Sequence, residues 1–210
     1  FGAVQIGPNN INKGWDWCSG YHYSDSIVIG FSHLHLNGTG CSDTGDILFM
    51  PYTGKARTQP GTQQDPLSGY ASYYSKDNER ALPGYYEVLL KTHRTKVELT
   101  ASDRVAFHRY TFPKDVEKHV MINLKDANGD DRPTDTYLEQ INDTVIRGYR
   151  YSTGWSKKQQ IYFSAVFSQP VHLTLYHDSV QVAGNRLQGL DVKGNVAVAP
   201  VVEELGVKVG

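Results

Sequence analysis

The chain has 210 residues and nearly balanced charge, with 21 Lys and Arg against 22 Asp and Glu and no long run of one sign. This balance gives no electrostatic footprint for nucleic acid or for an anionic membrane surface. No apolar run approaches the roughly 20 residues of a transmembrane helix, and the first residues lack the charged and apolar regions of a signal peptide.

Residues 14–46, which we call the opening cluster, are the most unusual segment of the sequence. They contain two Trp, two Tyr, three His and both Cys, set among glycines and serines. Aromatic rings stack on the apolar faces of sugars, and His, Asp and Ser supply donors and acceptors for hydroxyls. The segment therefore favours a site for a hydroxyl-rich ligand. The alternative is that its aromatic residues fill a core.

Two histidines of the opening cluster, His33 and His35, are two residues apart in a strand-like stretch. Side chains at this spacing share one face of a strand, as in some metal sites of β-barrels. The following residues, from Asn37 to Gly40, supply no third ligand. The sequence thus favours polar ligand contact or core hydrogen bonding for these histidines, and it predicts no metal site. Cys18 and Cys41 permit either one disulfide or two thiols.

Short β-rich runs predict the fold class. No helical pattern of similar strength competes with them, so we expect an all-β fold, a large antiparallel two-sheet β-sandwich formed by one domain over residues 1–210. The runs cover residues 26–31, 46–50, 85–90, 96–101, 105–112, 119–124, 144–151, 161–167, 172–176 and 192–199.

Turn residues separate these runs, and residues 52–68 form a long loop without a period. The acidic string at 126–131 is similar to a calcium loop, but its Gly stands at position 4 instead of 6, so it predicts a solvated hairpin turn. Four turns are predicted on this basis: Asn128-Gly129, Gly154-Trp155, Ala183-Gly184-Asn185 and Lys193-Gly194-Asn195.

Several long strings of the chain resemble the amino-terminal domain of glycoside hydrolase family 92, the exo-acting, calcium-dependent α-mannosidases. They occur in the family's order along most of the chain. The strings are GWDWCSGYHYSD (14–25), GFSHLHLNGTGCSD (30–43), GDIL (45–48), PGYY (83–86), ELTA (98–101) and HRYTFP (108–113).

The resemblance implies a β-sandwich of the galactose-mutarotase-like, supersandwich kind, packed in the complete enzyme against an (α/α)6 helical domain. Such enzymes hydrolyse terminal α-mannosides with inversion, which needs one carboxyl group as acid and another as base. In the family these groups and the ligands of the Ca²⁺ cofactor belong to the helical domain. We therefore expect a domain that is incomplete at both ends relative to the family, with the helical domain absent, no catalytic residue of its own and no activity alone.

The resemblance also narrows the ligand of the opening cluster to a mannose-containing glycan, with the helical domain as the partner across the pocket. It implies a bacterial enzyme that is periplasmic, displayed on the cell surface or secreted. The competing interpretation is a non-catalytic carbohydrate-binding β-sandwich module. The predicted substrate-binding residues are Trp15, Trp17, His22, His33, His35, Gly38, Gly40 and Asp43.

Overall fold

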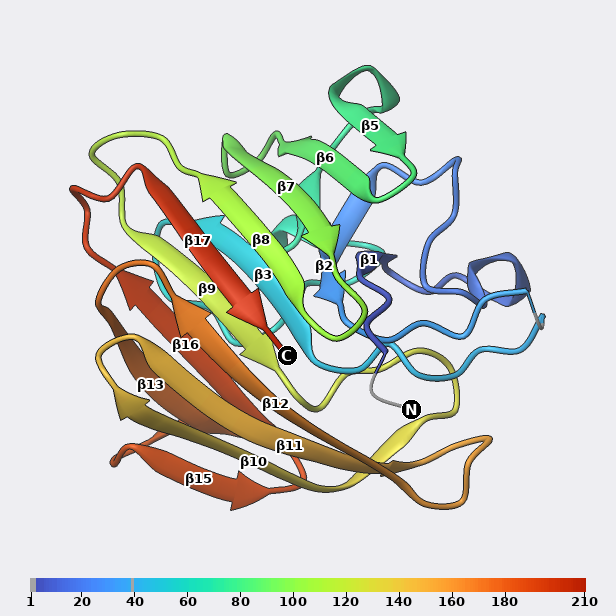
Figure 1. The fold of residues 1–210 in the computed structure, drawn as a ribbon. Coiled ribbons are helices and arrows are strands. Elements are labelled where there is room, and N and C mark those ends of the chain that lie inside the picture. The colour runs from blue at the N-terminus through green and yellow to red at the C-terminus, as the bar shows by residue number, and fades with distance from the viewer. Residues whose placement is uncertain (1–2, 39) are drawn as a thin grey trace.

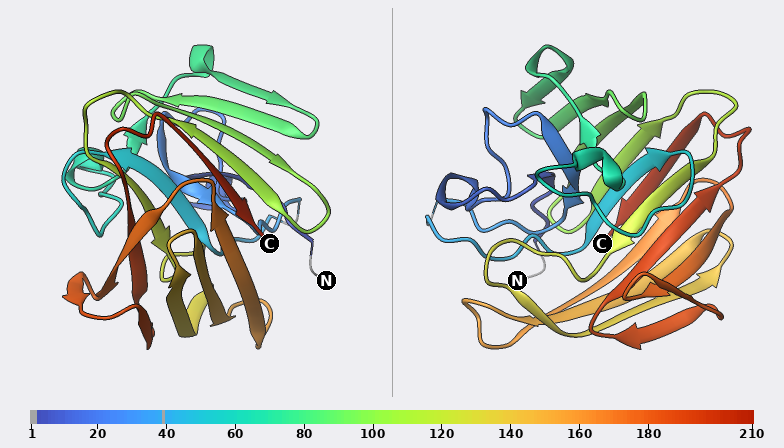
Figure 2. Two further views of the ribbon diagram at one scale, coloured as in Figure 1. Left: turned by 60° about the vertical axis from the view of Figure 1, so that its left-hand side comes forward. Right: turned by 180° about the vertical axis from the view of Figure 1, so that it is seen from behind.

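Buried and exposed side chains alternate along most strands, as expected for sheets with one face in a core. In β12 (Gln159–Phe167), Phe163, Ala165 and Phe167 are buried, whereas Tyr162 and Val166 are exposed. The computed structural model, which describes residues 3–38 and 40–210, places these strands in two antiparallel sheets that lie face to face (Figures 1 and 2). The prediction of an all-β, two-sheet sandwich is confirmed.

One sheet has eight strands. In spatial order they are β1 (Gly7–Asn10), β2 (Ile27–Ser32), β3 (Leu48–Thr53), β9 (Lys118–Asn123), β16 (Val192–Val198), β13 (Val171–His177) and β14 (Val180–Val182), with β4 (Ser72–Tyr73) paired to β2.

The other sheet has nine strands. Three short 3-10 helices complete the regular structure of the described residues: η1 (Trp15–Trp17), η2 (Pro66–Ser68) and η3 (Lys76–Asn78). None of these is long and apolar enough to cross a membrane. The strands, in spatial order, are β15 (Arg186–Gly189), β10 (Arg132–Asn142), β11 (Val145–Thr153), β12, β17 (Glu204–Val209), β8 (Ala106–Thr111), β7 (Thr95–Ala101), β6 (Tyr85–Leu90) and β5 (Glu79–Leu82).

Aromatic and aliphatic side chains of both sheets fill the space between them. Phe49 of β3 meets Phe163 of β12 edge to face, with ring centroids 6.3 Å apart. Both rings are buried, and burying one such side chain stabilises the fold by about 1.5–3 kcal/mol. The core therefore joins the two sheets directly.

Each predicted β-rich run overlaps a strand, but the longest strand, β10, was not predicted. Its inner face offers mainly Thr136 and Leu138, and its outer face carries Asp135, Tyr137 and Glu139. The apolar alternation is therefore too weak to detect. Pro133 near its start is tolerated because the register with β11 shifts there.

One predicted turn is wrong, and a second lies in a turn but not in the hairpin that was expected. Lys193-Gly194-Asn195 lies inside β16, where Gly194 allows the sheets to approach closely: a Cβ there would lie 2.4 Å from a side-chain atom of Leu138. Asn128-Gly129 is not a solvated hairpin turn, because it belongs to the connection from β9 in one sheet to β10 in the other. Asn128 is buried by its contacts with the opening cluster.

Candidate functional site

Loops from distant parts of the chain meet the opening cluster at one end of the sandwich. Figures 1 and 2 show the loops of residues 11–26, 33–38 and 40–47, the β9–β10 connection and the tip of the β11–β12 hairpin on the same side. The side chain of Asn128 donates to the carbonyl of Cys18 at 2.6 Å, and the amide of Trp155 donates to Asp43 at 3.0 Å. The cluster is therefore supported from both sheets.

The two tryptophans of the cluster point in different directions. They were expected to face the same way in an extended stretch, but they lie in η1, where residues two apart are separated by about two thirds of a turn. Trp15 is 73% exposed and stands beside Gly40. Trp17 is half-buried, stacks on His22 with centroids 4.2 Å apart, and donates from Nε1 to Asp25 at 2.8 Å. Only Trp15 presents an open ring face.

His33 lies inside the core. Its Nδ1 donates to the carbonyl of Ile47 at 2.5 Å, so its Nε2 accepts from His108, 2.9 Å away. The other nitrogen of His108 then accepts from the Tyr110 hydroxyl at 2.7 Å. Burial lowers the pKa of His33 to about 4 and that of His108 well below its ordinary value. The pair is therefore neutral, and both nitrogens of His33 are engaged.

His35 follows the end of β2 and pairs with Thr44 in an isolated bridge. Its Nε2 lies 3.0 Å from both Ser32 Oγ and Asn9 Oδ1, and its Nδ1 lies 3.0 Å from the carbonyl of Gln5. These partners differ from those of His33, so the two rings do not form a pair. Across residues 3–38 and 40–210, no group of three or more His, Cys, Asp or Glu could hold a metal ion.

Asp43 and Asp46 lie at the base of the cluster. Oδ2 of Asp43 accepts from the Trp155 amide, and Oδ1 is buried without a hydrogen-bond partner among the described residues. Asp46 is fully buried and forms an ion pair with Arg150, which also lies 2.6 Å from Asp131. Burial raises the pKa of Asp46 to about 6, although the guanidinium lowers it. Asp43 therefore binds the β11–β12 hairpin, and Asp46 binds Arg150 of β11, so both carboxylates connect the opening cluster to the nine-stranded sheet.

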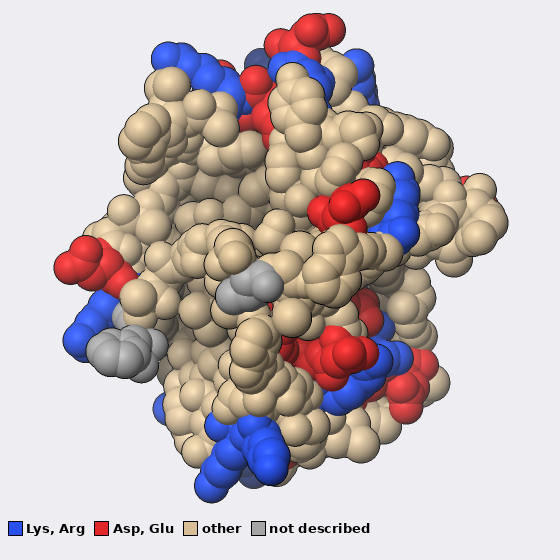
Figure 3. Space-filling model, turned by 90° about the vertical axis from the view of Figure 1, so that its right-hand side faces the viewer, with Lys and Arg blue, Asp and Glu red and all other residues tan. Residues whose placement is uncertain are grey.

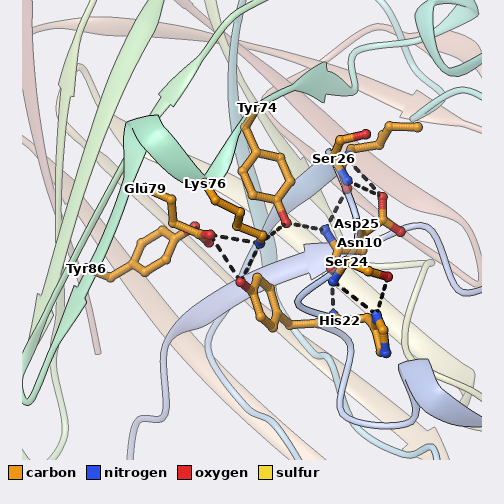
Figure 4. Close-up of polar contacts among 11 residues, drawn as sticks. Asn10, His22, Ser24, Asp25, Ser26, Tyr74, Lys76, Glu79 and Tyr86 are labelled. Carbon is orange, nitrogen blue, oxygen red and sulfur yellow. Dashed lines mark hydrogen bonds and ion pairs between the residues drawn. The ribbon is translucent and has the colours of Figure 1, made fainter.

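A pocket of about 490 Å³ opens beside the cluster, next to a network of tyrosines around Lys76 (Figure 4). Lys76 Nζ donates to Tyr21 at 2.6 Å and to Glu79 at 2.8 Å, and Glu79 accepts from Tyr86 at 2.7 Å. Burial opposes the charge of Lys76, but these hydrogen bonds outweigh it and raise its pKa; burial raises the pKa of Tyr21 to about 12. The pocket walls include Gln5, Gly7, Tyr21, Tyr23, His35 and Tyr86.

The sequence predictions missed Lys76, Glu79 and Trp155 in this region. Trp155 was placed in a turn, and it is 65% exposed beside the cluster. No sequence signal links these residues to the opening cluster, because they are far from it along the chain. Figure 3 shows the end of the molecule that carries the cluster, where a hollow lies among uncharged residues to the left of centre. Exposed rings, glycines and a pocket whose Lys76 and Glu79 form an ion pair suit a neutral, hydroxyl-rich ligand.

Comparison with known proteins shows the family of the chain. The family description "Glycosyl hydrolase family 92 N-terminal domain" matches residues 1–210, whereas no curated protein sequence matches. A family GH92 α-mannosidase from Bacteroides thetaiotaomicron, solved in complex with mannoimidazole, is 34% identical, with a TM-score of 0.93 over 100% of this chain and 29% of its own. The inverting family GH92 mannosidase of Bacteroides thetaiotaomicron VPI-5482 shares the fold at 20% identity, with a TM-score of 0.80 over 100% of this chain and 27% of its own. The chain belongs to glycosyl hydrolase family 92 as the family's N-terminal domain.

Proposed function

We propose that the chain is the N-terminal domain of an exo-acting, inverting α-mannosidase, and that its opening cluster forms one wall of the mannose-binding pocket. Family membership supports the reaction class. The role of the cluster rests mainly on the exposed ring of Trp15. Contact between so much aromatic surface and water is unfavourable, and a bound sugar would remove it.

The ring of Trp15 lies beside Gly40. A Cβ at Gly40 would lie 3.3 Å from Cζ2 of the ring, and Gly40 has a φ of +70°, which a side chain would strain. Gly38 also has positive φ and open space around it, while Thr39 lies outside the described residues. In this proposal the ring provides a face for the apolar side of a pyranose, and Gly38 and Gly40 allow its hydroxyls to approach the backbone.

The other predicted substrate-binding residues divide into two groups in this proposal. His22 stacks on Trp17 and its Nδ1 bonds Ser24 at 2.8 Å, while its Nε2 has no partner among the described residues and is available to a hydroxyl. Trp17, His33, His35 and Asp43 are engaged by other groups of the protein, so they act by positioning the loops of the wall.

The acid and base of the reaction belong to another domain of the complete enzyme in this proposal. Inversion needs two carboxyl groups about 6.5–9.5 Å apart with a water between them. Asp46 has the raised pKa of an acid catalyst but is fully buried against Arg150, so it cannot reach a sugar. The described residues also do not fit a calcium site, so we assign the Ca²⁺ ligands to that other domain and derive no step through the ion. An extracytoplasmic location stays a prediction, which cell fractionation tests.

The test replaces Trp15 in the complete enzyme and measures kcat and KM on an α-1,2-linked mannobioside. Trp15→Ala is expected to lower kcat/KM at least about tenfold, the equivalent of 1.4 kcal/mol, because stacking on the sugar is lost, and Trp15→Phe is expected to retain most activity. Tyr73→Ala, which removes a 39% exposed ring from β4, serves as the control. Unchanged kcat/KM in Trp15→Ala, with unchanged thermal unfolding, contradicts the proposal.

A further inference from the structure

The outer face of the nine-stranded sheet carries a row of tyrosines far from the opening cluster in sequence. Tyr137 of β10 is directly opposite Tyr149 of β11, which is directly opposite Tyr162 of β12. Gln188 of β15 continues the row beyond Tyr137. Because neighbouring strands are about 4.8 Å apart, the register alone sets three rings side by side across the sheet. We call Tyr137, Tyr149 and Tyr162, together with Tyr151, the tyrosine row.

The rings of the tyrosine row touch one another and remain open to solvent. Ring centroids are 5.4 Å apart for Tyr137 and Tyr149, 4.4 Å for Tyr149 and Tyr151, and 5.9 Å for Tyr149 and Tyr162. Tyr162 is 64% exposed, and the other three are half-buried. Cross-strand pairing explains why such rings stabilise a sheet, but burial in a core would do so better. The open faces leave room for a ligand.

Polar groups flank the row on both sides and fix the rings. Tyr137 donates to Glu139 at 2.8 Å, and Arg147 forms an ion pair with Glu139 at 2.9 Å. On the other side, Asp135 accepts from Tyr149 and from Gln188, each at 2.9 Å. Burial and the bond to Asp135 raise the pKa of Tyr149 to about 12, so its hydroxyl stays a donor at neutral pH.

The charges beside the row are balanced, because the carboxylates of Glu139 and Asp135 are matched by two guanidinium groups, those of Arg147 and Arg186, which both act on Glu139. A charged ligand therefore gains no net attraction, whereas a neutral ligand with hydroxyls finds donors and acceptors next to ring faces. A hollow of about 640 Å³ lies along the row, bordered by Tyr137, Arg147, Tyr149, Tyr162 and Ser164. This hollow is open, so an elongated ligand can lie across it.

We propose that the tyrosine row is a second carbohydrate-binding surface, which holds a neutral oligosaccharide chain on the outer face of β10, β11 and β12. It is distinct from the opening cluster and does not depend on the proposed mannose pocket. The rings would stack on successive sugar units, and the flanking side chains would bond their hydroxyls.

The experiment measures binding of mannohexaose, cellohexaose and xylohexaose to the complete protein by calorimetry, with Trp15→Ala as the background to remove the proposed mannose pocket. We expect at least one of the three to bind this background. Tyr162→Ala should weaken that binding about tenfold and Tyr162→Phe by less than about threefold, because stacking needs the ring and not the hydroxyl. Tyr162 is the most exposed ring of the row, so its replacement leaves the core intact.

Tyr73→Ala is the matched control, since it removes an exposed tyrosine of the other sheet. Equal binding by Tyr162→Ala and its parent, or no binding of any of the three oligosaccharides, overturns the proposal. Nitration with tetranitromethane supplies a second readout. Rapid nitration of Tyr162, slowed by the bound oligosaccharide, supports the proposal; protection of Tyr162 without ligand shows that another part of the protein covers the face and overturns it.

Discussion

Replacing Arg150 by Met tests whether the buried ion pairs of Arg150, next to the opening cluster, stabilise the fold. The side chain of Arg150 is fully buried, and it donates from Nε to the carbonyl of Leu124 at 2.9 Å. Its guanidinium pairs with Asp46 and lies 2.6 Å from Asp131. Methionine replaces the aliphatic stem of arginine but not its guanidinium, so the variant leaves a cavity and two carboxylates without their cation.

Removing one partner of a buried ion pair typically destabilises a protein by about 3–5 kcal/mol, and Arg150 serves two carboxylates. We therefore expect Arg150→Met to lower the free energy of unfolding at pH 8 by at least about 3 kcal/mol. The loss depends on pH. Burial raises the pKa of Asp46 to about 6 in the wild type, and loss of the guanidinium raises it further.

A carboxyl whose pKa is raised by folding stabilises the fold below its unfolded pKa, and this contribution is lost as pH rises through the folded pKa. In the pH range where Asp46 is protonated in the variant but ionised in the wild type, the deficit of the variant narrows by about 1.4 kcal/mol per unit as pH falls. Below pH about 6 both proteins carry the proton, and the deficit becomes constant.

Urea unfolding at pH 8, 7, 6 and 5 measures this deficit. Lys114→Met is the control, because Lys114 and Glu203 are both exposed, and an ion pair between two exposed side chains contributes less than about 1 kcal/mol. A loss below about 1 kcal/mol in Arg150→Met, or a deficit that does not change with pH, would refute the reasoning.

Two further predictions concern the core and the loop contacts. Because burial lowers the pKa of His33 to about 4, its ring should stay neutral in an NMR titration down to about pH 5. Its contribution to the free energy of unfolding should be lost only as the pH drops from about 6.5 toward 4. A titration midpoint near 6.5 in the folded state would contradict the hydrogen-bonded pair with His108. Gly129→Ala should lower thermal stability by about 2 kcal/mol or more, since its Cβ would lie 2.1 Å from that of Ser42, whereas Gly84→Ala, with similar positive φ and open space, should lose only about 1 kcal/mol. Equal losses in the two glycine variants would show that the contact with Ser42 is unimportant.

The sequence predicted the architecture well where apolar alternation is strong. β6 and β7 were expected at 85–90 and 96–101, and they occupy Tyr85–Leu90 and Thr95–Ala101. It failed at β10, whose outer face is polar, and at Gly194, whose glycine serves sheet packing instead of a turn. Apolar alternation along the sequence predicts which face of one strand is buried, but it does not predict which residues pack against that face.

The same division holds for function. The long strings of the chain resemble the family, and the family match over residues 1–210 confirms that prediction. The ligand of the opening cluster stays a prediction, based on residue types that suit sugar recognition. Only the tertiary structure separated the exposed ring of Trp15 from the packed ring of Trp17 and placed His33 in the core. It also brought Tyr137, Tyr149 and Tyr162 into one row. The exposure of a side chain and the residues that it contacts depend on how distant segments pair. Hydrogen bonds between strands and contacts between sheets set that pairing, so no single segment of the sequence determines it.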